Sequence, residues 1–342
     1  QKQPEIPDFE KLNEFFATIG SVLSKKVEPH DEIVRVPNFD KTMFLSSTDE
    51  KEVAKLIQNL KNKKSIGHDG ISNEMLKCCS PIIEKYIVKA FNRCIDLKKF
   101  PNFLKVAKVV PVFKKGERDN PENYRPISLL TSISKLFEKL LYSRMVNFFN
   151  TNKLFSPMQF GFRAKHLCVH AIVSITDYMR GEIDKRNSGQ ACFLDLKKAF
   201  DSLDHTVLMN KLYSYGFRGP THELIEDYLS NRWQFVEVNR KKTERQPIKT
   251  GVPQGSILGP FLFLVYINDL AIYARNNNKI AIFADDTSNQ EKDRMHPYSP
   301  IWTRLAIGFC IINSLNISEC EVMNFGLRNS TKLTLLRKQL PI

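Results

Sequence analysis

Apolar residues recur at every third or fourth position in several segments of the chain, and this spacing predicts amphipathic helices. The sequence T-D-E-K-E begins at Thr48 and predicts a helix cap ahead of one such segment. The predicted helices cover residues 9–23, 48–60, 81–97, 133–149, 171–179, 207–215 and 224–229. The uninterrupted apolar stretch 261–267 predicts a buried helix. No apolar run reaches the roughly 18 residues typical of a membrane span.

Shorter runs of β-branched and aromatic residues predict strands between these helices. Residues 106–113, 191–196 and 280–284 are such runs. Residues 235–238 and 246–250 flank the basic segment 240–245, so we predict that they pair as a hairpin. The segment 240–245 then lies in the turn, where it is either solvated or in contact with a nucleic-acid backbone. The pattern as a whole predicts a mixed arrangement of helices and strands without internal repeats.

The composition indicates which class of partner the chain binds. The 342 residues carry a formal charge of +14 and a pI near 9.4, with 42% hydrophobic residues. That hydrophobic content is sufficient for a substantial core. The positive excess suits a phosphate-rich partner, although a solvated basic surface gives the same excess. The seven cysteines include no C-x-x-C spacing, which argues against a disulfide framework or a zinc module and favours a reducing compartment.

Two predicted strands each end in acidic residues. Asp195 follows A-C-F-L, and Asp285 and Asp286 follow I-A-I-F-A. Carboxylates beside buried strands are costly unless a cation compensates them, and hard oxygen ligands suit Mg²⁺. Three such acids are able to hold a pair of ions for phosphoryl transfer. The alternative is structural, with the Asp pair in a hairpin turn and Asp195 as a cap.

Several blocks in a fixed order connect these acids to a known family. They are S-I-G-H-D-G-I-S, V-V-P-V-F-K-K-G-E, N-Y-R-P-I-S-L-L, Q-F-G-F-R, F-L-D-L-K-K-A-F-D, G-V-P-Q-G-S-I-L-G-P and F-A-D-D-T. From about Leu56 to Thr287 the chain resembles the reverse transcriptases of non-LTR retrotransposons, particularly jockey-like LINE elements. The resemblance implies an RNA-directed DNA polymerase that uses an RNA template, a DNA primer, dNTPs and two Mg²⁺ ions, with Mn²⁺ as a possible substitute.

The resemblance also implies a fold and its subdomains. We expect an α+β right-hand polymerase, in which helical and mixed fingers precede a palm with an antiparallel sheet. Residues 1–48 are expected to be a linker with a short helix. Residues 49–189 would be the fingers with part of the palm, and residues 190–288 the palm with the catalytic motifs. Residues 289–342 would be a degraded end of the palm, in an internal fragment whose thumb is truncated.

Individual roles follow from the resemblance where the residues match. Asp195, Asp285 and Asp286 would be the catalytic metal ligands. Phe200, five residues after Asp195, would exclude a 2′-hydroxyl under the incoming sugar; ordinary core packing is its alternative. Asp201 would be structural.

The nucleotide-binding residues would come from two other blocks. Lys114 and Arg125 match positions that grip the triphosphate, with Lys115 as a competitor of Lys114 and a template-backbone contact as the alternative role. Gln254 and Gly255 would contact the nucleotide; a plain junction capped by Ser256, ahead of a helix starting about there, is their alternative.

Other features bear on these expectations less directly. His166 and His170 are spaced for one helix face and for a metal, but no third ligand lies nearby in the sequence, which favours a surface or packing role. After Ser288 the match weakens, and Glu319 stands where the family commonly carries a lysine, which predicts slower turnover. The second hypothesis is therefore a catalytically degenerate remnant that only binds nucleic acid. A group II intron maturase ranks third.

Overall fold

The computed structural model describes residues 8–24, 38–62, 65–187, 189–196, 198–273, 279–284, 286–291, 321–325 and 334–335, and from residue 285 onward it describes the backbone only. The chain forms two compact units that are interleaved along the sequence. Unit 1 comprises Gln1–Val22, Pro37–Asn152 and His205–Leu262. Unit 2 comprises Leu23–Val36, Lys153–Asp204 and Phe263–Ile342. Glu319 lies outside the described residues.

Unit 1 contains most of the helices. They are α1 (Phe9–Ser24), α2 (Glu50–Gln58), α3 (Asn73–Leu97), α4 (Ser132–Thr151), α6 (His205–Ser214), α7 (Pro220–Leu229) and the first half of α8 (Leu258–Ile267), with short 3-10 helices η1 (Asn102–Lys105) and η2 (Pro121–Asn123). Each helix that the apolar spacing predicted here is present. The cap of α2 differs from the prediction, because Asp49 rather than Thr48 accepts the Glu52 amide, at 2.8 Å. The Thr48 hydroxyl instead donates to the Glu52 carboxylate.

The sheet of unit 1 is built around β1 (Val106–Phe113). Its strand order is β2-β1-β4-β5, with β6 also paired to β4, and the other strands are β2 (Tyr124–Leu129), β4 (Arg232–Val238), β5 (Lys241–Lys242) and β6 (Gln246–Ile248). Strand β1 is antiparallel to β2 and parallel to β4. A hairpin is present around 240–245, but its register differs from the prediction. Strand β6 pairs with residues 232–234 of β4 rather than with 235–238, and Lys241 and Lys242 form β5 instead of lying in the turn.

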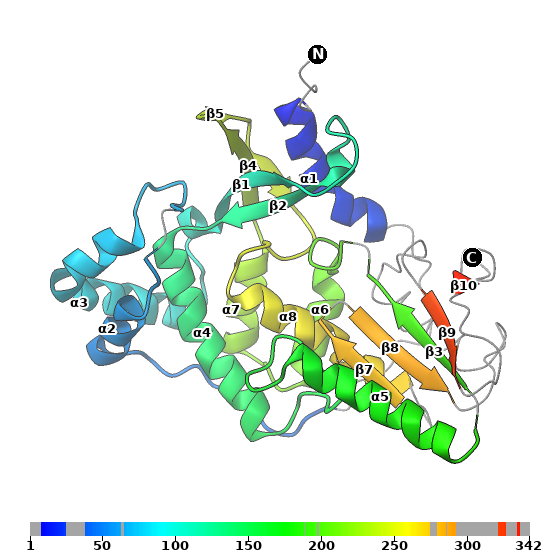
Figure 1. Cartoon of the computed structure of the whole chain (residues 1–342). Coiled ribbons are helices and arrows are strands. Elements are labelled where there is room, and N and C mark those ends of the chain that lie inside the picture. The colour runs from blue at the N-terminus through cyan, green and yellow to red at the C-terminus, as the bar shows by residue number, and fades with distance from the viewer. Residues whose placement is uncertain are drawn as a thin grey trace. The chain divides into compact units, whose positions relative to one another are not determined.

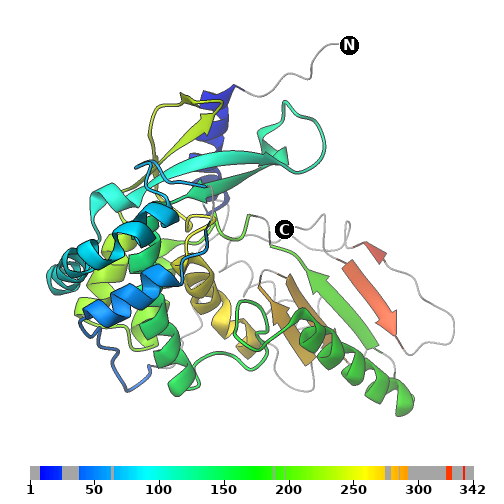
Figure 2. The same ribbon diagram turned by 60° about the vertical axis from the view of Figure 1, so that its left-hand side comes forward.

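One face of this sheet is covered by α1, as Figures 1 and 2 show. Leu12 and Phe16 of α1 are buried against Val109, Tyr124 and Val236 of three strands. Burying a side chain of this size contributes about 1.5–3 kcal/mol. The first helix is therefore part of the core of unit 1.

Strand β2 was not predicted, because Pro126 interrupts its apolar pattern and a proline cannot donate to a ladder. Pro126 lies opposite Pro111 of β1. The parallel pairing of β1 with β4 extends only from Val106 to Val109, so Pro111 is beyond it. Neither proline therefore interrupts the ladder between β1 and β4.

Aromatic side chains pack α3, α4 and α7 together. Phe137 of α4 stacks on Phe91 of α3 at 4.6 Å and on Phe100 at 5.2 Å between ring centroids. Phe100 meets Tyr228 of α7 edge to face at 5.0 Å. Aromatic pairs in these arrangements add about 0.5–1.5 kcal/mol beyond their burial.

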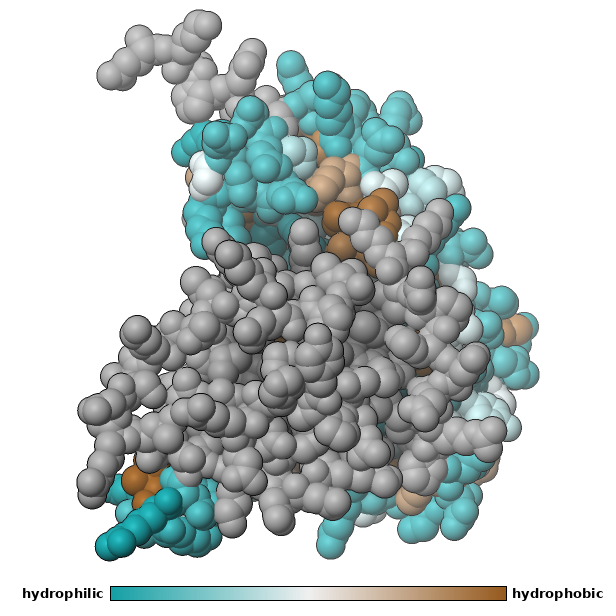
Figure 3. Space-filling model, turned by 90° about the vertical axis from the view of Figure 1, so that its right-hand side faces the viewer, coloured by the Kyte–Doolittle hydropathy of each residue, from teal (hydrophilic) through white to brown (hydrophobic). Residues whose placement is uncertain are grey.

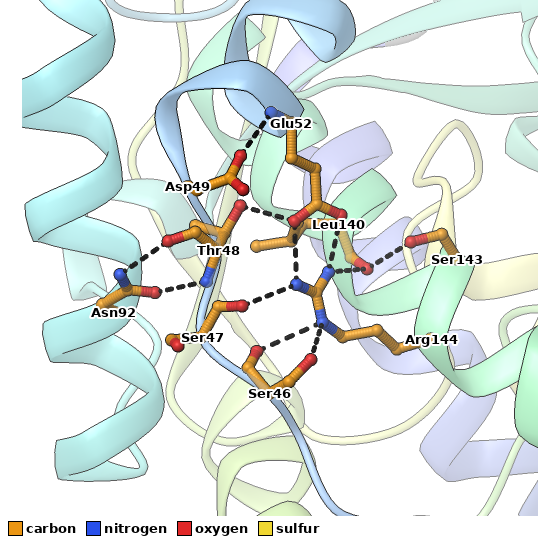
Figure 4. Close-up of polar contacts among 9 residues, drawn as sticks. All are labelled: Ser46, Ser47, Thr48, Asp49, Glu52, Asn92, Leu140, Ser143 and Arg144. Carbon is orange, nitrogen blue, oxygen red and sulfur yellow. Dashed lines mark hydrogen bonds and ion pairs between the residues drawn. The ribbon is translucent and has the colours of Figure 1, made fainter.

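A polar network fixes the segment that leads into α2 (Figure 4). Arg144 of α4 donates to both carboxylate oxygens of Glu52, at 3.0 and 2.9 Å, and to the backbone oxygens of Ser46 and Ser47. Asn92 of α3 exchanges two hydrogen bonds with the backbone of Thr48. Burial alone would raise the pKa of Glu52, but the hydrogen bonds from Arg144 and Thr48 leave that pKa below its ordinary value.

Unit 2 is an antiparallel sheet with one long helix beside it (Figure 1). The strand order is β10-β9-β3-β8-β7, from β3 (Gly189–Leu194), β7 (Lys279–Phe283), β8 (Asp286–Glu291), β9 (Glu321–Phe325) and β10 (Thr334–Leu335). Helix α5 (Cys168–Asp184) lies against β7 and β8, and η3 (Asn268–Tyr273) follows α8. The strands predicted at 191–196 and 280–284 are confirmed within two residues, and β3 is the central strand.

Helix α8 confirms the prediction of a buried apolar helix, since every residue from Phe261 to Ile267 is buried. Among the described helices, none combines the length and apolar character needed to cross a membrane. In the view of Figure 3, hydrophilic residues cover most of the described surface and apolar residues appear as small separate patches.

Candidate active site

The strand register of unit 2 aligns two of the three predicted acids. The last paired residues of β3 and β8 are Leu194 and Thr287. Asp195 follows Leu194 and Asp286 precedes Thr287, so one further step of this antiparallel register sets the two acids opposite each other. Asp195 is half-buried. The backbone thus brings Asp195 and Asp286 together at one end of the sheet, while Asp285 lies outside the described residues.

A tight turn joins β7 to β8, the strand that begins with Asp286. Phe283 of β7 pairs with Asp286 of β8, and Ala284 adopts the left-handed conformation with φ +58°. The Q-F-G-F-R block runs beside this turn: the Phe160 amide donates to the Ile282 oxygen at 2.8 Å, and the Ile282 amide donates to the Met158 oxygen at 2.9 Å. The block therefore extends the sheet at the outer edge of β7. Its motif was visible in the sequence, but the role of the block was not.

Phe200 lies in a turn shortly after Asp195 and is half-buried. Its ring stacks on Phe263 at 5.0 Å with an interplanar angle of 23°. It also meets Phe162 edge to face at 5.9 Å. Two aromatic neighbours thus restrict the orientation of the Phe200 ring, and part of that ring remains accessible.

In unit 1, Lys114 and Arg125 share one face of the β1–β2 ribbon. Arg125 pairs with Val112, and both side chains are exposed. The Lys114 amide donates to the Asn123 oxygen at 2.8 Å, which continues the ladder one residue past β1. Because side chains alternate between faces along a strand, Lys114 falls on the face of Val112 and Arg125, and Lys115 falls on the other. Among the described residues, Lys114 and Arg125 form no ion pair.

The P-Q-G loop lies against β2, the strand that carries Arg125. The Ser128 amide donates to the Gln254 oxygen at 2.8 Å. Gly255 has φ +125°, and a Cβ atom there would stand 2.6 Å from the Ser128 oxygen. Only glycine fits such a conformation and such an approach. Strand β2 therefore places Arg125 and this loop in one part of unit 1.

The buried carboxylate of Glu138 accepts hydrogen bonds from the residues that follow the P-Q-G loop. Glu138 of α4 accepts the Ile257 amide at 2.5 Å, the Leu258 amide at 3.4 Å and the Tyr228 hydroxyl at 3.3 Å. Burial raises the pKa of Glu138, and the nearby Arg232 guanidinium opposes that effect. The sequence signal for Glu138 is an acid within the apolar stripe of α4, and the apolar spacing alone does not show which groups that acid binds.

The junction with α8 agrees in part with the prediction. The Ser256 hydroxyl accepts the Gly259 amide at 3.0 Å, so Ser256 does cap the helix. The helix itself begins at Leu258, two residues later than predicted.

The histidine pair does not lie on one helix face. His166 precedes α5, and its Nδ1 lies 3.0 Å from the Ala164 oxygen. His170, inside α5, accepts the Leu167 amide through Nδ1 at 3.1 Å. Over the described ranges, no three His, Cys, Asp or Glu side chains form a metal-sized cluster, and the side chains of Asp285 and Asp286 are not within those ranges. Both histidines therefore contact the nearby backbone in this structure.

Residues 112–293, more than half of the chain, match the model of the reverse transcriptase (RNA-dependent DNA polymerase) family, and the chain belongs to that family.

Several relatives of the chain are proteins of mobile elements. The probable RNA-directed DNA polymerases from transposon BS and from transposon X-element of Drosophila melanogaster are each 32% identical to it, over 69% and 77% of this chain and 27% and 29% of those proteins. The RNA-directed DNA polymerase from mobile element jockey of the same species is 29% identical over 75% of this chain and 29% of that protein. The chain thus spans less than a third of the length of these relatives, and the expected resemblance to jockey-like elements is confirmed.

Proposed function

We propose that the chain is the RNA-directed DNA polymerase region of a non-LTR retrotransposon protein. The observation that supports this proposal is the pairing of β3 with β8, whose register, continued one residue past Leu194 and Thr287, aligns Asp195 with Asp286. In the proposed reaction, the 3′-hydroxyl of a DNA primer attacks the α-phosphate of a dNTP opposite an RNA template. The new phosphodiester bond forms as the bond to the leaving pyrophosphate breaks.

The acids fit a divalent cation. Carboxylate oxygens are the ligands that Mg²⁺ prefers, and two acids meeting at a strand end need a cation to offset their repulsion. Asp195, Asp285 and Asp286 would hold two Mg²⁺ ions, with Mn²⁺ as a substitute. When bound, Mg²⁺ lowers the pKa of the attacking hydroxyl and offsets the negative charge on the phosphates.

The remaining residues bind and select the nucleotide. Arg125 offers a planar fork of donors and Lys114 a point charge, and both are exposed on one face for the triphosphate. Gln254 and Gly255 contact the nucleotide from the loop that the Ser128 amide anchors. Phe200, held by Phe263 and Phe162, blocks a 2′-hydroxyl and so favours deoxynucleotides.

The subdomains follow the same proposal. The chain would be a right-hand polymerase, with fingers and part of the palm in residues 49–189 and the palm in 190–288. Residues 1–48 would lead into the fingers, with α1 packed against the sheet of unit 1, and residues 289–342 would form the end of the palm.

Primer extension on poly(rA)/oligo(dT) tests the activity. We expect magnesium-dependent incorporation of dTTP that is lost in Asp285→Asn, with a fall of at least about 10³-fold, since removal of a metal ligand removes transition-state stabilisation. Tight, salt-sensitive binding of the duplex without extension would instead identify a remnant that only binds nucleic acid.

A further inference from the structure

The side chain of Gln159 touches the turn that leads into the acidic pair. Gln159 is 1% exposed. Its Oε1 accepts the Gly161 amide at 2.7 Å and the Ala284 amide at 3.3 Å. Ala284 is the residue immediately before Asp285. One buried oxygen thus joins the Q-F-G-F-R block to the turn.

The orientation of this amide is determined by its partners. Both neighbours are backbone N–H donors, so only the oxygen of Gln159 is able to face them. The Nε2 group is buried and has no acceptor among the described residues. A buried donor without an acceptor costs about 1–3 kcal/mol. An apolar side chain of the same shape would fill the space without that cost, so packing alone does not account for an amide here.

The glycine of the block brings the two segments into contact. A Cβ atom on Gly161 would stand 2.1 Å from the Ala284 nitrogen and 2.9 Å from its Cα. The Gln159 backbone is itself held, since the Arg163 guanidinium donates to its oxygen at 3.0 Å and to the Ser156 oxygen at 2.9 Å. Asn268 in turn accepts the Ser156 amide at 2.8 Å. The block is therefore a fixed support for the turn.

From these contacts we propose that Gln159 is a positioning residue for the acidic pair. Its oxygen holds the Ala284 amide, which sets where the chain enters Asp285 and Asp286, and the fixed turn holds the carboxylates ready for divalent cations. The inference rests on the proposed function, because it takes Asp195, Asp285 and Asp286 as the metal ligands. Gln159 itself does not touch substrate in this proposal.

The test is Mn²⁺ binding to the purified chain, followed by electron paramagnetic resonance in the absence of nucleic acid. We expect Gln159→Met to weaken Mn²⁺ binding at least tenfold, because the turn loses its acceptor while the volume is kept. The matched control is Gln234→Met, which makes the same change at a glutamine 5% exposed in β4 of unit 1 and bonded there to Asn13. The control should bind Mn²⁺ like the parent chain.

Primer extension supplies a second measurement. Gln159→Met should raise the Mg²⁺ concentration needed for half-maximal rate at least tenfold, leave KM for dTTP within about twofold, and recover rate at high Mg²⁺. General destabilisation would not be reversed by Mg²⁺ in this way. Equal Mn²⁺ affinity and equal Mg²⁺ requirement in Gln159→Met and the parent would overturn the inference.

Two further variants distinguish failure of the positioning role from failure of the proposed metal site. If Gln159→Met does not fold, Gly161→Ala replaces it, since the added Cβ must displace Ala284; unchanged Mn²⁺ affinity in folded Gly161→Ala contradicts the inference. Asp195→Asn tests the metal site itself. Loss of Mn²⁺ in Asp195→Asn with full retention in Gln159→Met removes only the positioning role, whereas retention in Asp195→Asn removes the proposed site.

Discussion

Glu138 is a buried acid with a structural task beside the P-Q-G loop. Its carboxylate accepts the Ile257 and Leu258 amides at the start of α8, where the positive end of the helix dipole also favours a negative charge. Arg232 is 1% exposed, with its guanidinium 4.8 Å from the Tyr228 ring centroid. The acid and the guanidinium compensate each other in a place where either alone would be costly.

Removing Glu138 should therefore destabilise the chain more than removing the pair. We expect Glu138→Leu to cost about 3–5 kcal/mol, because Arg232 then stays buried without its counter-charge. The double variant Glu138→Leu, Arg232→Met should recover part of that loss. Urea unfolding of the two variants checks this, and a double variant less stable than the single one would contradict it.

The Phe200 ring is expected to determine which sugar the incoming nucleotide carries. Phe200→Ala should raise the ratio of kcat/KM for ribonucleotides over deoxynucleotides at least tenfold, because the substitution removes the ring that we propose obstructs a 2′-hydroxyl. Phe162→Ala is the matched control, since it removes a ring that contacts Phe200 but leaves the obstruction in place. Single-nucleotide incorporation assays measure both ratios. An unchanged ratio in active Phe200→Ala would assign the ring to packing.

Between elements, one acid ties α7 to the segment before β1. Asp227 accepts the Phe100 amide at 2.8 Å, the Lys105 ammonium at 2.8 Å and the Lys99 ammonium at 2.9 Å. Burial alone would raise the pKa of Asp227, but these hydrogen bonds outweigh it and hold that pKa below its ordinary value. Lys105 is 1% exposed, so its charge depends on this partner.

The lowered pKa of Asp227 has a defined consequence for stability. A depressed acid pKa adds stability above the unfolded-state pKa, about 4, and that stability is lost as pH falls through the folded-state value. Asp227→Asn should cost about 3 kcal/mol at neutral pH and flatten the loss of stability below pH 4. Urea unfolding from pH 3 to pH 7 measures this. Exposed Asp96→Asn serves as the control for the same substitution and should change the stability at neutral pH by less than about 0.5 kcal/mol.

The helices and strands that a local apolar pattern determines were predicted from the sequence. Strand β1 has the predicted bounds because its run from Val106 to Phe113 is uninterrupted. Strand β8 was not predicted, since D-T-S-N-Q-E has no apolar alternation and is held by pairing with β3 and β7. The alignment of Asp195 with Asp286 depends on that pairing. The acids were therefore predictable as residues, and their register was not.

The positive charge of the whole molecule has a measurable effect. Arg240, in the turn after β4, and Lys241, at the start of β5, are both exposed. Binding of a primer–template duplex should weaken with salt, and Arg240→Gln with Lys241→Gln should lower the slope of log affinity against log salt by about 2. Fluorescence anisotropy at several salt concentrations measures the slope. If the double variant keeps the slope of the parent, the segment 240–241 does not contact the duplex. Asp285→Asn is the control and should also keep the slope of the parent.

The interleaving of the two units affects how the protein is made. Strand β1 takes its parallel partner β4 from more than a hundred residues further along the chain. A ribosome therefore releases β1 and β2 long before β4 emerges to cover their edge. Until then the nascent chain exposes an unpaired apolar strand, a target for chaperones and for aggregation. A premature stop ahead of residue 232 should thus yield an insoluble product rather than a smaller stable unit.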